Sequence, residues 1–71
     1  MAATEEPPLG QRLRHIRSMA HLSEDTLALL VGLTVDDIAR IEAGGSVSLR
    51  TVEEIAKACG FDVVITFRPR P

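Results

Sequence analysis

Apolar residues recur at helical spacing in four stretches of this chain, and each stretch is bounded by residues that start or stop helices. The first stripe has spacings of four, three and four residues and consists of Leu9, Leu13, Ile16 and Ala20. Such spacing places apolar side chains on one face of a helix, because an α-helix has about 3.6 residues per turn. We therefore predict a first helix that begins near Leu9.

Hydroxyl side chains mark the predicted starts of three further helices. Ser23, Thr34 and Ser48 each precede an apolar stripe, and serine and threonine are favoured N-caps. Asp37 stands three residues after Thr34, in the position of a capping-box acid. The predicted helix stops are glycines, namely Gly32, the pair Gly44 and Gly45, and Gly60. The expected buried stripes are Leu27, Leu30 and Val31, then Val35, Ile38 and Ile41, and finally Leu49, Val52, Ile55, Ala56 and Cys59.

Residues 61–71 break the helical pattern. They are rich in β-branched and aromatic residues and end in prolines, which predicts a β-strand. A lone strand leaves its backbone groups without partners, so we expect it to pair with the same strand of a second copy about a two-fold axis. The expected dimer contacts are Phe61, Val63, Val64, Ile65 and Phe67. The alternatives are that this tail packs as an extended arm on its own helices or is a frayed end.

The predicted fold is therefore mainly α, a domain of four to five helices with a C-terminal β-strand that pairs across a homodimer. Residues 1–8 contain small, acidic and proline residues without periodicity, which indicates a disordered leader. Residues 9–60 are expected to form the helical domain, and residues 61–71 the dimerisation tail.

Length and composition narrow the classes of function. A chain of 71 residues supports one small core, which favours a binding module over an enzyme. The single cysteine, Cys59, cannot form an internal disulfide, and His15 and His21 do not share a helical face, so we expect no metal and no cofactor. Neither an export signal nor a run of about 18 apolar residues is present, so we expect a cytoplasmic protein without membrane contact.

Charge is distributed unevenly along the chain, although the net charge is only −2. Residues 9–22 carry three arginines and no acid, whereas residues 23–45 carry five acids and one arginine, a net charge of −4. Proteins that coat nucleic acid nonspecifically usually have an excess of basic residues. The composition therefore argues against that function.

Several short motifs, taken in order, carry a family resemblance. They are Leu9-Gly10-x-Arg12-Leu13-Arg14, Leu22-Ser23, Leu27-Ala28, Gly32-Leu33-Thr34, Ile38-Ala39-Arg40-Ile41-Glu42 with Gly44, and Ser48-Leu49. With this order and spacing, residues 9–60 resemble the helix-turn-helix domains of the phage repressor and Cro type, also called the xenobiotic-response-element (XRE) family. The resemblance implies a transcriptional repressor that binds an inverted-repeat operator in double-stranded DNA as a homodimer. The short chain with a strand after the fourth helix also resembles repressor-antitoxins, which implies a toxin as a second partner.

The resemblance also implies where DNA would bind, because the third helix of such domains enters the major groove. The implied DNA-binding residues are Ser23, Glu24, Thr34, Val35, Asp36, Asp37, Ala39, Arg40 and Arg50. Glu24, Asp36 and Asp37 depart from the family, which usually has amide or small residues there. An aspartate can accept a hydrogen bond from the cytosine amino group, or it can complement the helix N-terminus. We favour the second role for Asp37, and both stay open for Asp36.

Positive charge for the phosphates must come from basic side chains. The candidates are Arg12, Arg14, Arg17, Arg40, Arg50 and Lys57, with Arg68 and Arg70 beyond the strand, and the alternative for each is a solvated surface charge. We interpret Arg40 and Glu42 as a surface or structural ion pair rather than as a site, and we favour a structural role for Glu42. The alternative function keeps the fold without DNA: the acidic surface of the third helix would bind a protein, such as a basic toxin.

Overall fold

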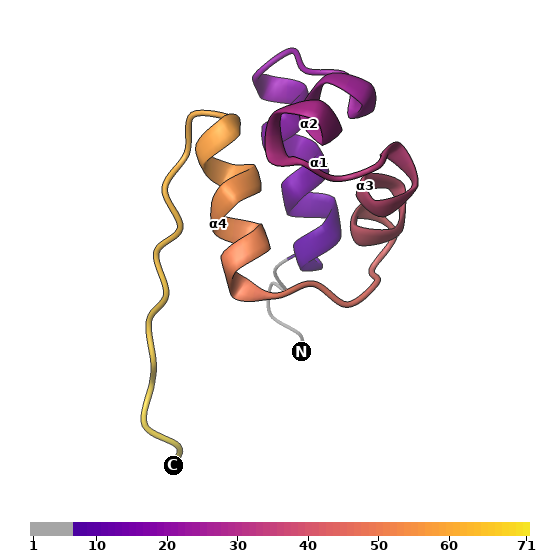
Figure 1. The fold of residues 1–71 in the computed structure, drawn as a ribbon. Coiled ribbons are helices and arrows are strands. Elements are labelled where there is room, and N and C mark those ends of the chain that lie inside the picture. The colour runs from indigo at the N-terminus through magenta and orange to yellow at the C-terminus, as the bar shows by residue number, and fades with distance from the viewer. Residues whose placement is uncertain (1–6) are drawn as a thin grey trace.

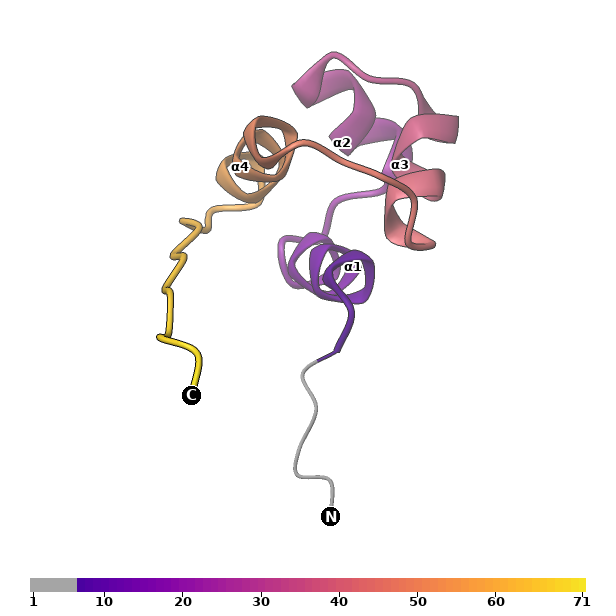
Figure 2. The same cartoon turned by 90° about the horizontal axis from the view of Figure 1, so that it is seen from below.

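Four α-helices form the regular structure in the computed structural model, which describes residues 7–71. They are α1 (Leu9–Met19), α2 (Glu24–Val31), α3 (Val35–Glu42) and α4 (Leu49–Ala58). Both α1 and α2 contact α3 and α4, so the helices surround one core (Figure 1). Seen from below, α1 lies between α4 and α3 (Figure 2). The expectation of a mainly α fold is confirmed, with four helices.

The helices begin at the residues that the sequence predicts. The Ser23 side chain accepts a hydrogen bond from the Thr26 backbone N–H, and Ser48 caps α4 in the same way through the N–H of Thr51. Thr34 caps α3. These bonds satisfy N–H groups that have no partner within the helix, so each cap fixes where its helix starts.

The core consists of aliphatic residues and one cysteine. Leu27, Ile38 and Ile55 are the largest fully buried side chains, and they come from three different helices. The other buried apolar residues are Leu13, Ala28, Ile41, Val52, Ala56 and Cys59. Neither phenylalanine is among them, so the small core is closed by interdigitating aliphatic side chains.

Four residues of the predicted apolar stripes are exposed. The exposed fractions are 48% for Leu9, 59% for Leu30, 37% for Val35 and 51% for Leu49. Three of them are the first residues of their helices, where only one side has a neighbouring turn. A four-helix domain of this size has too little interior to cover the flanks of every stripe.

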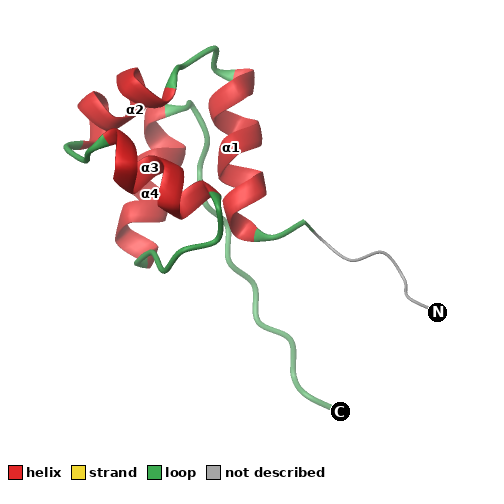
Figure 3. Ribbon diagram, turned by 90° about the vertical axis from the view of Figure 1, so that its right-hand side faces the viewer, coloured by secondary structure: helices red, strands yellow, loops and turns green. Residues whose placement is uncertain are grey.

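The predicted β-strand does not form in residues 61–71, and no β-strand occurs anywhere in residues 7–71. The segment is instead an irregular tail that runs away from the helices toward the C-terminus (Figure 3). The physical reason is that a strand needs a partner edge for its hydrogen bonds, and a single chain of this fold offers none. The expected leader lies mostly outside the described residues; of it, only the exposed Pro7 and Pro8 are seen, directly before α1.

Candidate nucleic-acid interface

The helix-turn-helix unit consists of α2, α3 and the turn between them. Gly32 ends α2 with a φ of 74°, a left-handed conformation that glycine adopts without strain. The backbone N–H of Leu33 donates to the Ala28 carbonyl at 2.9 Å, which closes the turn. Ala28 is 3% exposed, and its small side chain lets α2 cross closely against the next helix. Gly32 and Ala28 therefore help to set the angle between α2 and α3.

The two faces of α3 differ in burial. Ile38 and Ile41 are 1% and 3% exposed and fix the inner face of the helix to the core. The exposed members of the opposite surface are Val35, Asp36, Ala39 and Arg40. The structure thus brings together four of the residues that the sequence proposes for DNA contact. We call these four residues the α3 face.

Asp37 belongs to a capping box at the start of α3. The Thr34 backbone N–H donates to Asp37 Oδ2 at 3.1 Å, and the Asp37 backbone N–H donates to Thr34 Oγ1 at 3.0 Å. Hydrogen bonds from Thr34, led by its backbone N–H, lower the pKa of the Asp37 carboxyl, and the charge of Arg40 adds to this effect. The carboxylate therefore stabilises the turn and the helix N-terminus.

Arg40 is held against the loop between α3 and α4. Its Nη1 donates to the Ser46 carbonyl at 2.9 Å, and its Nη2 lies 3.7 Å from Asp37 Oδ1. A Cβ at Gly45 would lie 2.7 Å from the Arg40 Cγ, so glycine is required for this loop to fold over the side chain. About half of the Arg40 side chain is nevertheless exposed. Its guanidinium is oriented by the loop yet remains accessible.

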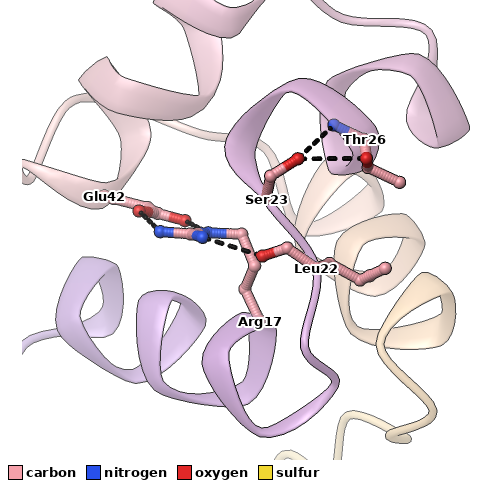
Figure 4. A network of polar contacts seen from close by, with 5 residues as sticks. All are labelled: Arg17, Leu22, Ser23, Thr26 and Glu42. Carbon is pink, nitrogen blue, oxygen red and sulfur yellow. Dashed lines mark hydrogen bonds and ion pairs between the residues drawn. The ribbon is translucent and has the colours of Figure 1, made fainter.

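Arg17 is part of an ion pair with Glu42 rather than an exposed charge. Its Nε donates to Glu42 Oε2 at 2.7 Å and its Nη2 to Glu42 Oε1 at 2.9 Å, while Nη1 donates to the Leu22 carbonyl at 2.9 Å (Figure 4). The side chains are only 14% and 7% exposed. Arg40 has Asp37 as its ion-pair partner, so the expected pair of Arg40 with Glu42 is wrong.

Sequence reasoning missed the pairing of Arg17 with Glu42. The hydrogen bond with Glu42 raises the pKa of Arg17, and the charges of Glu42 and Glu24 raise it further. Glu24 is half-buried, and its charge acts on the pKa of Arg17 without a direct ion pair being needed for this effect. A signal was present in the sequence: Arg17 and Glu42 each lie next to an apolar core position, where a charged side chain needs a partner.

The start of α2 is held by side-chain hydrogen bonds. Ser23 Oγ lies 3.0 Å from both the backbone nitrogen and the hydroxyl of Thr26 (Figure 4). Asp25 is exposed in the first turn, where the helix dipole favours a carboxylate. Ser23 is therefore the structural N-cap of α2.

Other basic residues lie on α1 and α4. Arg14 and Lys57 are exposed. Arg50, whose side chain is 89% exposed, has its Nε 3.7 Å from Glu54 Oε2, one turn further along α4. A pair this open to solvent contributes little to stability, so the Arg50 guanidinium can exchange its partner for another anion.

The proposed dimer residues form an exposed apolar tail. Their exposed fractions are 37% for Phe61, 82% for Val64, 51% for Ile65 and 91% for Phe67, and Val63 is half-buried. Val63 packs against the core. The tail also lines a groove of about 520 Å³ with residues of α1 and α4.

The cysteine, the potential metal ligands and the helix lengths show no further site in residues 7–71. Cys59 is buried, and burial raises the pKa of its thiol, so it belongs to the core. Within the described residues, no cluster of three or more histidine, cysteine, aspartate or glutamate side chains has the geometry to hold a metal ion. None of the helices described is both long and apolar enough to cross a membrane.

Comparison with known proteins agrees with this geometry. A search of curated proteins finds no match. The family model described as a helix-turn-helix domain matches residues 8–64, which include all four helices and the start of the tail. Such domains bind DNA, so DNA is the partner that the family implies. The chain belongs to the helix-turn-helix domain family.

Proposed function

We propose that this protein is a sequence-specific transcriptional regulator of the repressor and Cro (XRE) type, which binds an inverted-repeat operator as a homodimer. The observation that carries the proposal is the α3 face, exposed in a domain whose inner α3 surface is fixed to the core. In a helix-turn-helix protein this helix enters the major groove with its N-terminal residues at the base edges. Two half-sites would then lie about 34–36 Å apart, one turn of DNA.

Asp36 is the proposed base-contacting residue of the α3 face. It is exposed at the second position of α3, and unlike Asp37 it takes no part in the capping box. A carboxylate has no donor, but it can accept a hydrogen bond from the cytosine amino group in the major groove. Val35 and Ala39 flank it with apolar surface that suits a thymine methyl group. A C·G pair in each half-site follows from this arrangement.

Phosphate contacts fall to basic residues around the α3 face. Arg40 is oriented by the Ser46 carbonyl and remains half-exposed, and Arg50 stands at the start of α4 with only a weak intrahelical pair. The first-turn N–H groups of α2, beside Ser23, add the positive end of a helix dipole. The negative charge of Glu24 repels phosphate, against the attraction of these N–H groups. Glu24 would therefore exclude a phosphate from the side of α2 on which it lies.

The resemblance to repressor-antitoxins supports a second partner for such a protein, a toxin. The exposed tail of residues 61–71 and the leucines of α2 provide apolar surface that a protein partner can cover: Leu29 is 82% exposed and Leu30 is 59% exposed. In this proposal the α3 face binds DNA while a different surface binds the toxin. Repression and neutralisation would then be separable by mutation.

The second candidate function is a protein-binding module that does not bind DNA. It is favoured by the acidic character of the α3 surface, where Asp37 offsets the charge of Arg40 and Asp36 adds a net negative charge. The two functions differ in their dependence on salt. Binding to DNA through several arginines weakens steeply as salt rises, because the arginines release condensed counterions from the phosphates.

Selection of bound duplexes from a random DNA library, at low and moderate salt, tests the proposal. Enrichment of a palindrome supports operator binding, and a C·G pair common to both half-sites supports the role of Asp36. The matched variant is Asp36→Asn, which keeps the size of the side chain and adds a donor, so it should select adenine at that position. Absence of enrichment at both salt concentrations would favour the protein-binding module.

A further inference from the structure

The tail residues alternate in exposure, although the tail forms no strand in the single chain. Phe61, Val63 and Ile65 are less exposed than Val64, and all four line the groove with residues of α1 and α4. The less exposed positions are thus odd-numbered, the alternation of an extended β-strand. Phe67 continues the odd-numbered series but is 91% exposed in the single chain.

We propose that two copies pair through residues 61–69 as an antiparallel ribbon with Ile65 on the two-fold axis, and that the partner's Phe67 covers the α1–α4 groove. This inference deepens the proposed function, because it rests on the dimer and specifies how the dimer forms. The ribbon presents the odd-numbered face of both tails to the same side. The partner's Phe67 then lies opposite Val63. It is next to the α1–α4 groove of the chain that carries this Val63, which the tail of that chain leaves open.

Charge favours this register over an axis through Val64. An axis through Thr66 would also place Asp62 opposite an arginine, the partner's Arg70, but it would set Arg68 opposite the partner's Val64, an apolar residue. With Ile65 on the axis, Asp62 lies opposite the partner's Arg68, and Val64 lies opposite the partner's Thr66. Two opposite-charge pairs therefore form in each dimer. An axis through Val64 would instead place Asp62 opposite the partner's Thr66 and leave Arg68 opposite the partner's Gly60. A slip by a single residue would turn apolar side chains toward charged ones, such as Phe61 toward the partner's Arg68.

The backbone fits the same register. The Phe61 N–H already donates to the Ala56 carbonyl at 2.8 Å, and Pro69 has no N–H. Phe61 and the partner's Pro69 face each other across the ribbon. Because neither has an N–H to donate across it, they form a non-hydrogen-bonded pair. Because bonded and non-bonded pairs alternate along an antiparallel ladder, the N–H groups of the four even-numbered residues donate across the axis. These are Asp62, Val64, Thr66 and Arg68.

The same alternation makes the axial pair a non-bonded one. Ile65 and the partner's Ile65 then have Cα atoms about 4.5 Å apart, the closer of the two spacings in an antiparallel ladder. Cysteines at this position lie within the usual distance of a disulfide, whereas cysteines at position 64 would face the partner's Thr66 rather than each other. The axis can therefore be located by cross-linking.

The test uses the full-length variants Ile65→Cys and Val64→Cys under mild oxidation, with the parent chain as control because its Cys59 is buried. The proposal predicts near-complete interchain cross-linking of Ile65→Cys under conditions that leave the other two chains uncross-linked. Preferential cross-linking of Val64→Cys would overturn the register. A dimer in sedimentation that cross-links at neither position would overturn the ribbon.

Charge reversal provides an independent measurement. Asp62→Arg and Arg68→Asp should each weaken the dimer about tenfold or more, and the double variant should restore it, because two like-charge pairs become opposite-charge pairs again. Failure of the double variant to recover would contradict the Asp62–Arg68 pairing. DNA binding is measured separately. A monomer that binds DNA would refute this inference alone, and a cross-linked dimer without DNA affinity would refute only the proposed function.

Discussion

Arg17 and Glu42 join α1 to the end of α3 by two parallel hydrogen bonds, with Arg17 Nε 2.7 Å from Glu42 Oε2. The same guanidinium binds the Leu22 carbonyl, so one side chain links three segments that are separate in the sequence. The two isoleucines of α3 hold the helix to the core, and this ion pair fixes its C-terminal end. The orientation of the α3 face therefore depends on a residue of α1.

Removal of either partner should destabilise the fold. We expect Glu42→Ala to lower the free energy of unfolding by about 2–3 kcal/mol, because it leaves a largely buried arginine without its carboxylate. Arg17→Lys should cost less, since it keeps the charge but loses the paired geometry. Urea unfolding of Glu42→Ala, Arg17→Ala and the double variant measures the coupling. Additive losses would mean that the pair has no energetic role.

Gly10 allows the start of α1 to approach the end of α3. A Cβ at this position would lie 2.6 Å from the Glu42 carbonyl oxygen, which is backbone and cannot move aside cheaply. Gly10→Ala should therefore destabilise the domain by about 1–3 kcal/mol, although alanine is otherwise the better helix former. Gln11→Ala, at the exposed neighbouring position, is the control and should be neutral or slightly stabilising. A more stable Gly10→Ala variant would contradict the close approach.

Asp37 should make the stability of the domain depend on pH. Its folded pKa is lowered from the ordinary value of 3.8, so its contribution is complete above that value and is lost as pH falls through the lowered pKa. We expect Asp37→Asn to be less stable than the parent chain at neutral pH. The difference in stability should disappear as the pH falls through the lowered pKa of Asp37. Thermal unfolding of both chains across acidic pH measures it. A difference that is constant with pH would exclude the carboxylate as the source.

Arg40 should contribute to DNA affinity without specifying sequence. We expect Arg40→Ala to weaken binding to all duplexes to a similar extent and to lower the salt slope by about one, as loss of a single phosphate contact does. Arg40→Lys keeps the charge but loses the hydrogen-bond geometry to Ser46, so it should retain most of the salt slope. Titrations by fluorescence anisotropy at several salt concentrations measure both. Affinity unchanged in Arg40→Ala would remove Arg40 from the interface.

Local features of the fold were predictable from the sequence. The caps Ser23, Thr34 and Ser48 and the stop at Gly32 act within a few residues of their helix ends, so residue type and spacing were sufficient. Long-range pairing was not predictable in the same way. Arg17 and Glu42 are 25 positions apart, and nearer charges competed for each of them.

Two further features could not be predicted from the sequence: a contact to a backbone carbonyl, and a structure that depends on a second chain. The Arg40 guanidinium binds the carbonyl of Ser46, a group that every residue carries, so no residue type signals the contact. The tail has the composition of a strand, but strand formation requires another edge, which a single chain does not supply. Composition therefore indicated the capacity of residues 61–71 to pair without determining their structure in the isolated chain.

Sequence-specific DNA recognition is tested by binding of the purified protein to a selected palindromic duplex and to a shuffled duplex of equal composition, measured between about 50 and 200 mM salt. We expect a preference for the palindrome of at least about 10³ and a linear fall of log affinity with log salt for both duplexes. Equal affinity for the two duplexes, or no binding at the lowest salt, would contradict sequence-specific DNA recognition by the α3 face.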